Sequence, residues 1–292
     1  EAAESLVVAK RPPDLIDEIP PEVRPEGNNV QWIPGYWMWS VEQEDFIWIS
    51  GIWRNFPPGR QWVSGYWEEV EGGFRWVSGF WQQVDAGEPA FLPEPPESLE
   101  VGPNQPAPTV EHFWIPGCWT WQTTQYVWRP GYWYQGQADW IWIPHRYVWT
   151  PRGYLFIRGY WDFPLVRRGL LYAPVYWARP LVAWRHLHYT PRYVVNVNLL
   201  LGNLFVHPIH RHYYFGHYDR DFRHRFGLTP WFDVHPHRHG GLRSYDPLLA
   251  YHHWQHHRHN PRWLDDMRAD FVQRHVVVVE ASASLVWVAF PL

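Results

Sequence analysis

Histidines crowd a short segment near the C-terminus, and they are the first candidates for chemistry in this 292-residue chain. The two groups are His235, His237 and His239, and His252, His253, His256, His257 and His259. His252 and His256 are four residues apart, so on a helix both imidazoles would lie on one face and could chelate a divalent metal ion. However, a metalloenzyme needs a third ligand and a base, no His-Glu-x-x-His motif occurs, and Arg238 and Arg258 would repel a cation. We therefore predict no metal site and a polar surface that becomes charged at about pH 6.

Other catalytic arrangements have no better starting point. Glu68 and Glu69, like Asp265 and Asp266, are sequence neighbours, and neighbours in a strand face opposite ways. The chain contains neither Gly-x-Ser-x-Gly nor a phosphate-binding glycine loop with its lysine. Its one cysteine, Cys118, occupies a slot that tyrosine fills in related segments, so we interpret it as a packed thiol. The sequence predicts a protein that is not an enzyme and that carries no cofactor.

Tryptophan dominates the sequence instead: the chain has 24 Trp, 17 Tyr and 15 Phe. A Trp-x-x-Gly-x-Trp pattern occurs in two blocks of four copies. The copies begin at Trp32, Trp48, Trp62 and Trp76, and at Trp114, Trp128, Trp142 and Phe156. Steps of about 14 residues separate most copies, and the seventh is degraded at His145. Pro20-Pro21-Glu22 precedes the first block and Pro95-Pro96-Glu97 the second, which indicates a duplication.

The segments between copies resemble the turns of β-hairpins, such as Glu71-Gly72-Gly73. Each copy is then one strand of about ten residues followed by a turn. We expect a mainly β fold: an antiparallel meander of tandem Trp-x-x-Gly-x-Trp strands in two blocks, followed by a mixed β and α-helical C-terminal region.

The Pro-Gly or Ser-Gly pair inside each strand needs an explanation, because two Trp five residues apart in a regular strand face opposite ways. A one-residue bulge at the glycine would bring both Trp onto one face, whereas a tight turn there would make each copy a small hairpin. The predicted bulge glycines are Gly35, Gly51, Gly65, Gly79, Gly117, Gly131 and Gly159. The Trp residues predicted to stack or to mediate assembly are Trp37, Trp53, Trp67, Trp81, Trp119, Trp133 and Trp161.

Composition changes along the chain predict seven segments. They are a Pro-rich N-terminal arm (1–30), a first Trp-repeat block (31–84), a Pro-rich acidic linker or arm (85–110), a second Trp-repeat block (111–165), a His/Arg/Tyr-rich mixed β region (166–244), a two-helix segment (245–275) and an apolar tail (276–292). In the mixed β region, residues 193–206 have the character of one or two buried strands. Asp246-Pro247 and Asn260-Pro261 each place an N-cap residue before a proline, which predicts helices over about 246–258 and 261–274.

Charge is distributed unevenly. Residues 1–110 hold 6 Lys/Arg and 18 Asp/Glu, a net charge of −12, and residues 111–292 hold 19 and 11, a net charge of +8. Opposite ends of two copies would attract each other, although two solvated surfaces of different sign would give the same count. Because Lys10 is the only lysine and the repeats lie largely in the acidic half, we predict no nucleic-acid partner. The chain has no apolar stretch of 18 residues, so we predict no membrane-spanning helix, and its first residues suggest either a mature terminus or a chain without a signal.

The repeat copies resemble the YXWWXGXW / WXXGXW tandem-repeat family of envelope-associated proteins of planctomycete-type bacteria. The similarity extends through residues 147–154 and 213–216 to 245–251, but not to the tail from Val276. The resemblance implies a secreted, cell-surface or periplasmic protein without enzymatic activity. We expect a structural, self-assembling envelope or extracellular protein that forms homo-oligomers or a filament or layer. The alternative is a carbohydrate- or cell-wall-binding module that stacks exposed Trp faces on glycans, with Glu68, Gln82 and Gln83 accepting sugar hydroxyls.

Overall fold

The computed structural model describes residues 6–40, 43–173, 175, 188–207, 212–216, 218, 220–234, 245–277 and 289–290. The predicted mainly β fold, with a mixed C-terminal region, is confirmed. Its strands in the repeat blocks form four long antiparallel hairpins, and each hairpin is built from two repeat copies.

The four hairpins are named here by their residues. Hairpin 1 (30–55) contains β3 (Val30–Ile33), β4 (Tyr36–Ser40), β5 (Asp45–Ile49) and β6 (Ile52–Asn55). Hairpin 2 (60–83) contains β7 (Arg60–Val63), β8 (Tyr66–Val70), β9 (Gly73–Val77) and β10 (Phe80–Gln83). Hairpin 3 (112–135) contains β12 (His112–Ile115), β13 (Cys118–Gln122), β14 (Gln125–Arg129) and β15 (Tyr132–Gln135). Hairpin 4 (141–162) contains β16 (Ile141–Ile143), β17 (Arg146–Thr150), β18 (Gly153–Ile157) and β19 (Tyr160–Asp162).

The meander is thus divided into separate hairpins. Among the described strands, those of one hairpin do not pair with those of another, and only short strands extend them. These are β1 (Val7–Val8) on β9, β11 (Phe91–Leu92) on β18, and β20 (Gly169–Leu170) on β6. The hairpins therefore contact one another through side chains.

Both expectations for the centre of the repeat are wrong. In hairpin 1, Ile33 pairs with Ile52 and Tyr36 pairs with Ile49. Both strands therefore have the same number of residues between these two pairs. A bulge would place an extra residue on one strand, and a turn at the glycine would reverse the chain there. The other three hairpins keep their register in the same way. Each copy is one long strand whose ladder is interrupted symmetrically.

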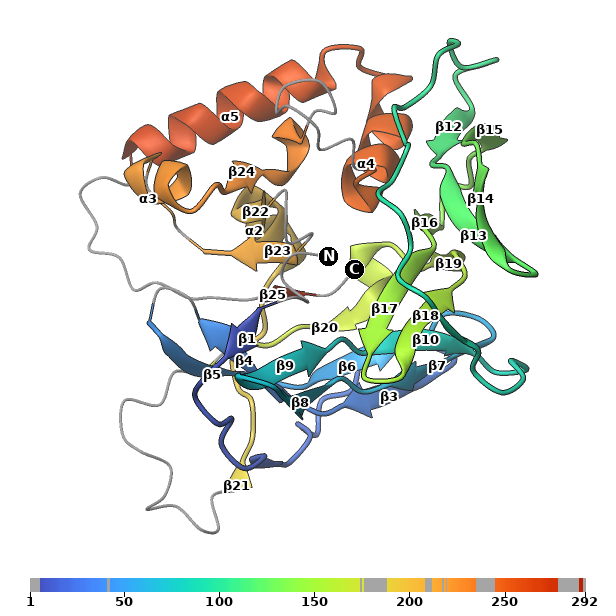
Figure 1. Cartoon of the computed structure of the whole chain (residues 1–292). Helices are drawn as coiled ribbons and strands as arrows, with labels where there is room; N and C mark the ends of the chain where they lie inside the picture. Colours follow the sequence, from blue (N-terminus) through green and yellow to red (C-terminus); the bar gives the residue numbers. More distant parts are fainter. Residues whose placement is uncertain are drawn as a thin grey trace.

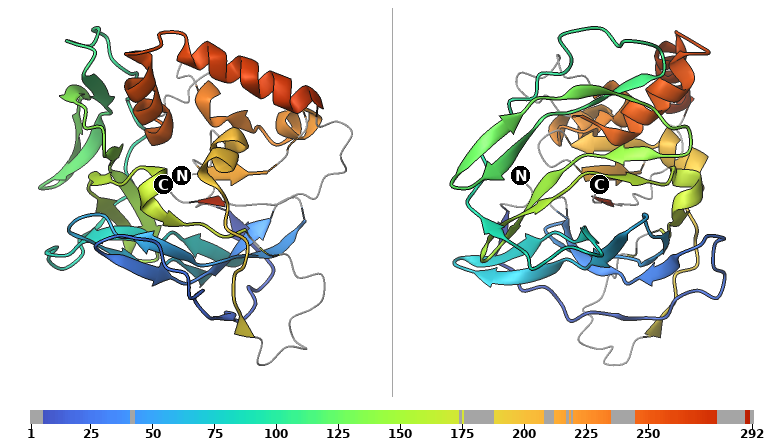
Figure 2. Two further views of the ribbon diagram at one scale, coloured as in Figure 1. Left: turned by 180° about the vertical axis from the view of Figure 1, so that it is seen from behind. Right: turned by 90° about the vertical axis from the view of Figure 1, so that its right-hand side faces the viewer.

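The hairpins are arranged in tiers. Figure 1 shows hairpins 1 and 2 in one layer, and the rotated view in Figure 2 shows hairpin 4 and then hairpin 3 above that layer. Hairpin 4 contacts hairpin 2 through Arg75, which lies 3.6 Å from the centroid of the Trp149 ring. Hairpin 3 contacts hairpin 4 through Phe113 and Trp161, whose ring centroids are 5.7 Å apart. Aromatic and cation–π contacts thus replace strand pairing between tiers.

The C-terminal region lies on the same side of the hairpin layer as hairpins 3 and 4 (Figure 1). After α1 (Leu165–Arg168), the chain forms β21 (His188–Tyr189), α2 (Val197–Gly202), β22 (Leu204–His207), β23 (His212–Phe215), α3 (Arg220–Arg225), β24 (Thr229–Pro230), the 3₁₀ helix η2 (Trp231–Asp233), α4 (Pro247–His257), α5 (Trp263–Val277) and β25 (Ala289–Phe290). Phe205, Trp231 and Phe232 are fully buried in its core, which also includes Ile33 and Ile49 of hairpin 1. The isoleucines that follow the first Trp of the two copies in hairpin 1 therefore face this core.

The C-terminal helices are where the sequence predicts them. Asp246 caps α4 by accepting a 2.7 Å hydrogen bond from the backbone N–H of Leu249, and Pro247 begins the helix. The one or two buried strands predicted over 193–206 are only partly present, because α2 forms there with Asn196 as its N-cap and β22 begins at Leu204. Most of the apolar tail and the histidines 235, 237 and 239 lie outside the described residues. In the described ranges, no helix is long and apolar enough to cross a bilayer.

Candidate functional site: the tryptophan–glycine notches and their straps

The interruption at the centre of each hairpin, called the notch below, consists of the two unpaired residues on each strand, which include the repeat glycines. The first Trp of one copy packs on the glycine of the paired copy. In hairpin 2, a Cβ on Gly65 would lie 2.5 Å from Cζ2 of Trp76, which is far inside van der Waals contact. The same relationship joins Gly35 to Trp48, Gly51 to Trp32, Gly79 to Trp62, Gly117 to Trp128, Gly131 to Trp114 and Gly159 to Trp142.

The repeat glycine is thus required by close packing and not by backbone conformation. None of the seven repeat glycines has a positive φ, whereas Gly72 in the turn of hairpin 2 has a φ of +88°. A methyl group at Gly65 would also lie 2.6 Å from the carbonyl oxygen of Val77. Only a hydrogen atom fits between the indole and the backbone, which explains why the motif is Trp-x-x-Gly.

The second Trp of each copy lies opposite the first Trp of its partner. Trp37 pairs with Trp48, and their ring centroids are 5.2 Å apart in an edge-to-face arrangement. Equivalent pairs are Trp32–Trp53, Trp62–Trp81, Trp67–Trp76, Trp114–Trp133, Trp119–Trp128 and Trp142–Trp161, at 5.1 to 5.5 Å. Each Trp–Trp contact contributes about 0.5–1.5 kcal/mol beyond the free energy gained by burying the two side chains. These Trp–Trp contacts are pairs within one hairpin and not ladders across a sheet.

A Pro-rich acidic segment lies on the Trp face of hairpin 1. This first strap (14–21) binds at three points: the carbonyl oxygen of Asp14 accepts from Nε1 of Trp37 at 2.9 Å, and that of Pro21 from Nε1 of Trp53 at 3.0 Å. Between them, Glu18 reaches into the notch. Because Trp37 and Trp53 both face the strap, the Trp residues do share one face, as the sequence suggested.

Glu18 is the centre of the first strap. Its carboxylate accepts from the backbone N–H groups of Gly35 and Gly51 at 2.8 and 2.9 Å and from Nε1 of Trp48 at 3.2 Å. Burial raises the pKa of the Glu18 carboxyl, while the hydrogen bonds from Trp48, Gly35 and Gly51 act in the opposite direction. The two glycine N–H groups that the ladder leaves unpaired are therefore satisfied by a carboxylate.

A second strap (97–105) binds hairpin 3 at the corresponding second Trp residues, and its glutamate accepts from one glycine N–H and a different indole. The carbonyl oxygen of Glu97 accepts from Nε1 of Trp119 at 2.8 Å, and that of Gln105 from Nε1 of Trp133 at 3.1 Å. Glu100 accepts from Nε1 of Trp114 at 3.1 Å and from the backbone N–H of Gly117. The Pro-rich segments therefore lie on their own chain, and the duplication includes strap as well as hairpin.

Hairpins 2 and 4 contact each other's notches with arginines. Arg146 of β17 donates to the carbonyl oxygen of Gly79 at 2.7 Å, and Arg60 of β7 donates to that of Gly159 at 3.2 Å. Trp67 and Tyr147, which hold the second-Trp position of copies three and seven, donate to the carbonyl oxygens of Trp37 and Trp119 at 2.9 and 3.0 Å. Each block thus packs its second hairpin on its first by the same bond.

The sequence analysis singled out the tryptophans and glycines that meet at the notches, but it gave the glycines a different role and missed Glu18 and Glu100. A signal for them exists, because each glutamate stands 17 residues before the first glycine of its block, Gly35 or Gly117. The duplicated Pro-Pro-Glu segments align Glu22 with Glu97, whereas alignment on the repeat glycines pairs Glu18 with Glu100. Spacing to the glycine, and not proline content, identifies the residues that enter the notches.

The histidine group of α4 is used for packing. The rings of His252 and His256 are stacked with centroids 5.8 Å apart, and His256 stacks on Trp263 of α5 at 5.2 Å. Burial lowers the pKa of His252 to about 4, and the neighbouring His256 lowers it further. In the described part of the chain, His, Cys, Asp and Glu side chains form no group of three that could hold a metal ion. Cys118 is buried, and burial raises the pKa of its thiol.

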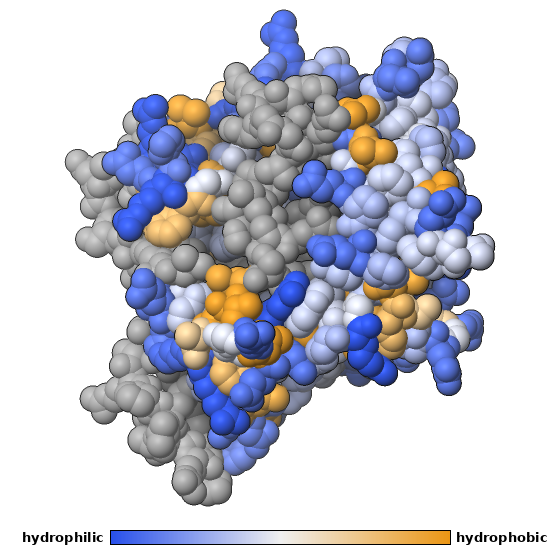
Figure 3. Space-filling model, in the orientation of Figure 1, coloured by the Kyte–Doolittle hydropathy of each residue, from blue (hydrophilic) through white to orange (hydrophobic). Residues whose placement is uncertain are grey.

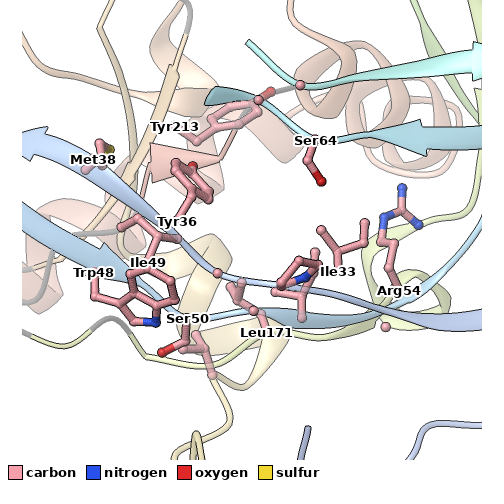
Figure 4. A pocket seen from close by; sticks show the side chains of 18 of the residues that line it. Ile33, Tyr36, Met38, Trp48, Ile49, Ser50, Arg54, Ser64, Leu171 and Tyr213 are labelled. Carbon is pink, nitrogen blue, oxygen red and sulfur yellow. The ribbon is translucent and has the colours of Figure 1, made fainter. Parts of the chain in front are cut away.

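A cavity of about 600 Å³ lies between hairpins 1 and 2 and the C-terminal region (Figure 4). Its walls are largely apolar, and Ile33, Tyr36 and Ile49 contribute from hairpin 1. The charged residues of the lining bind one another: Asp162 accepts a hydrogen bond from Arg54 at 2.5 Å and forms an ion pair with Arg168 at 3.3 Å. These charges join hairpin 1 to hairpin 4.

The sequence model of the WXXGXW repeat (2 copies) family matches residues 61–82, 112–134 and 138–162. These three matches coincide with hairpins 2, 3 and 4, so the two-copy unit of the family is one hairpin. Hairpin 1 repeats the geometry with a longer separation between its two copies. The predicted resemblance to the WXXGXW repeat is confirmed. No curated protein and no solved structure matches the chain.

Proposed function

We propose that this WXXGXW-repeat protein is a structural, non-enzymatic component of the cell envelope or extracellular space that associates with further copies of itself. The observation that carries the proposal is the repeated binding of an extended acidic segment by the Trp face of a hairpin. Residues 14–21 and 97–105 are held by the same contacts: two indole N–H groups donate to backbone carbonyl oxygens, and a notch binds a carboxylate. A hairpin of two repeats is therefore a surface for binding polypeptide.

The contacts that hold a strap are largely independent of side-chain identity. Backbone carbonyl oxygens accept at two of the three points, and a glutamate accepts at the third. Such a surface accommodates an equivalent segment of another copy as well as its own. The envelope or extracellular location rests on the resemblance to envelope-associated repeat proteins.

Charge favours the association of copies. The net charge of −12 over residues 1–110 and of +8 over residues 111–292 would draw the acidic part of one copy toward the basic part of another. On the face in Figure 3, polar side chains predominate and apolar ones form separate small patches. On this face, initial contact between copies would therefore depend on charge more than on an extended apolar surface.

Light scattering on the purified protein tests the proposal. We expect the mean mass to rise with protein concentration at about 0.05 M salt and to rise much less at about 1 M salt, where the Debye length falls to about 3 Å. Replacing the exposed Glu69, Glu71 and Asp85 by Gln should weaken the association. In a matched control, the exposed Gln31, Gln61 and Gln83 are replaced by Asn, which leaves the charge unchanged. A monomeric mass at every concentration and salt would contradict the proposal.

The glycan-binding alternative requires aromatic faces that are open to solvent. In the described part of the chain every Trp side chain is buried or half-buried, and the exposed aromatic rings of the repeats are Tyr66, Tyr132 and Tyr134. Polysaccharide retention that Tyr132→Ala and Tyr134→Ala abolish, together with a constant monomeric mass, would replace self-association with glycan binding. Retention without that loss would place the glycan elsewhere on the molecule.

A further inference from the structure

We infer that copies of this chain join by exchanging the N-terminal strap: the strap of one copy occupies the Trp face of hairpin 1 in the next. The inference rests on the proposed self-association and names its partner surface. The partner is a second copy of this chain, and the occupant is the segment that contains Asp14, Glu18 and Pro21.

The first strap is anchored by contacts that can be re-formed between copies. Glu18 binds three donors on hairpin 1, Asp14 and Pro21 accept one indole N–H each, and β1 at Val7 and Val8 pairs with β9 of hairpin 2. Farther along, β2 (Asp17–Glu18) pairs in parallel with β21. Each of these partners lies outside the strap, so a strap from another copy would find the same donors and the same strand edges.

The connection between strap and hairpin permits the exchange. Residues 22–29 join Pro21 to β3, and all of them except Pro25 are exposed. Gly27, Asn28 and Asn29 at the end of this connection are residue types that tolerate many backbone conformations. Eight extended residues span up to about 26–29 Å, enough to carry the strap away from its own hairpin. Because the native contacts are re-formed, the exchange costs little free energy beyond the loss of freedom on association.

The second strap is constrained differently. Its residues 97–105 lie between β11, which pairs with β18 of hairpin 4, and hairpin 3 itself, so both ends of the strap are attached to folded parts. The first strap is followed by hairpin 1, and the part of the chain that precedes it is anchored through β1. Its release requires the opening of the two-residue pairings β1–β9 and β2–β21 and the loss of the notch and indole contacts. Exchange of the second strap would have to separate hairpin 2 from hairpin 3, whereas among the described residues only β1 precedes the first strap. We therefore assign the exchange to the first strap.

The geometry also predicts what the products would be. If two copies exchange straps reciprocally, a closed dimer forms. If each copy gives its strap to a third, the contact is head-to-tail and the chain of copies stays open. The charge difference between the two parts of the sequence favours the head-to-tail contact, because it places unlike charges together.

Directed disulfide formation tests the exchange. Asp17 and His188 are register partners on β2 and β21, and both side chains are exposed, at 74% and 62%. Two full-length variants are made in a Cys118→Ser background, one with Asp17→Cys and the other with His188→Cys, and they are refolded together and oxidised. In this mixture a disulfide between positions 17 and 188 can form only when the strap of one copy lies on the other. We expect a mixed dimer on non-reducing gels at concentrations where light scattering shows association.

Four further samples make the outcome decisive. A chain with both substitutions reports the closed, intramolecular arrangement, and it shows that the pair can be oxidised. Replacing His188→Cys by Glu88→Cys, an exposed position outside the strap contacts, measures random collision. Adding Glu18→Ala to the Asp17→Cys chain should reduce the mixed dimer several-fold, while Glu22→Ala should not.

Failure of the exchange and failure of self-association give different results. If light scattering shows association but the mixed dimer does not exceed the Glu88→Cys level, while the doubly substituted chain oxidises internally, strap exchange is wrong and self-association stands. If the mass stays monomeric, both are wrong. A mixed dimer that is unaffected by Glu18→Ala would also overturn the exchange, because such a dimer would not depend on the notch.

Discussion

His145 and Phe156 lie on opposite strands of hairpin 4, with ring centroids 6.0 Å apart, at the one position where the repeat loses both its glycine and its first tryptophan. In the other seven glycine positions, an indole packs on the glycine from the opposite strand. A side chain at position 145 leaves no room for an indole, and the smaller phenylalanine takes its place. The two departures from the motif are therefore one change, because each is sterically required by the other.

Substitution of a notch glycine should destabilise the protein through this contact. We expect Gly65→Ala to lower the free energy of unfolding by about 1–3 kcal/mol, because the new methyl group overlaps the Trp76 ring and the carbonyl of Val77. Urea denaturation measures the loss. Gly87→Ala is the control, since a Cβ there meets nothing within 4 Å and should change stability by about 0.5 kcal/mol at most.

The pairing of His145 with Phe156 predicts a rescue. Adding Trp76→Phe to Gly65→Ala should restore part of the lost stability, although Trp76→Phe alone removes packing and is itself destabilising. The coupling energy from the double-mutant cycle should then be favourable, in the range of about 0.5–3 kcal/mol. Additive effects would mean that the clash with the Val77 carbonyl, and not the indole, decides the requirement for glycine.

The carboxylate in the first notch should protect two backbone amides. Glu18→Ala leaves the N–H groups of Gly35 and Gly51 and the indole N–H of Trp48 without their acceptor, which costs about 1–3 kcal/mol for each group that water cannot reach. We expect faster hydrogen exchange at Gly35 and Gly51 and little change at amides of hairpin 3. Glu22→Ala, at an exposed position beyond the strap, is the matched control, and equal exchange rates in both variants would contradict the role of Glu18.

The repeat made much of this fold predictable. Tandem aromatic copies with turn sequences between them indicate antiparallel strands, because hairpin turns have a recognisable chemistry. The caps at Asp246 and Asn260 likewise located α4 and α5, since an N-cap acts through residues next to it in sequence.

What could not be predicted depends on contacts between distant residues. The position of Gly35 in the motif can be read from the sequence, but glycine is required there because Trp48 of the opposite strand packs on it. The predicted bulge was inferred from one strand alone. The helix over residues 197–202 occurs in a Val/Leu-rich segment that resembles a strand, and the Asn196 cap decides the outcome. Glu18 was one acidic residue among many in a Pro-rich arm until its notch was known.

The buried pair of Arg54 and Asp162 should be far more important for stability than an exposed pair. Both side chains are almost completely buried, and Arg54 joins hairpin 1 to hairpin 4 and lies 5.2 Å from the centroid of Trp81. We expect Asp162→Asn to cost about 3–5 kcal/mol, because it leaves the guanidinium buried without a counter-charge. Lys10→Gln, which breaks the exposed ion pair with Asp45, should cost about 1 kcal/mol or less in the same denaturation assay.

Acid should destabilise the protein through His252. Its pKa is about 4 in the folded protein, below the value of about 6.5 in an unfolded chain, so the folded state binds fewer protons. The stabilisation from the neutral ring is complete above about pH 6.5 and is lost as the pH falls toward 4. His252→Phe keeps an aromatic ring against Trp231 and Trp263 but cannot be charged. Relative to this variant, the natural protein should lose about 2 kcal/mol between pH 7 and pH 5, measured as the difference in urea stability.

Asp246 should act in the opposite direction over the same range. Burial raises the pKa of its carboxyl to about 6, although the backbone N–H of Leu249 and the hydroxyl of Tyr213 both donate to it. Since the folded pKa exceeds the unfolded one, the group's stabilising effect is present at low pH and is lost as the pH rises through 6. Asp246→Asn keeps an N-cap oxygen for Leu249 and removes the titration. We compare the free energy of unfolding of the natural protein with that of Asp246→Asn. The difference, natural minus variant, should rise by about 1 kcal/mol from pH 7 to pH 5. A fall would show that Asp246 is held ionised by its donors.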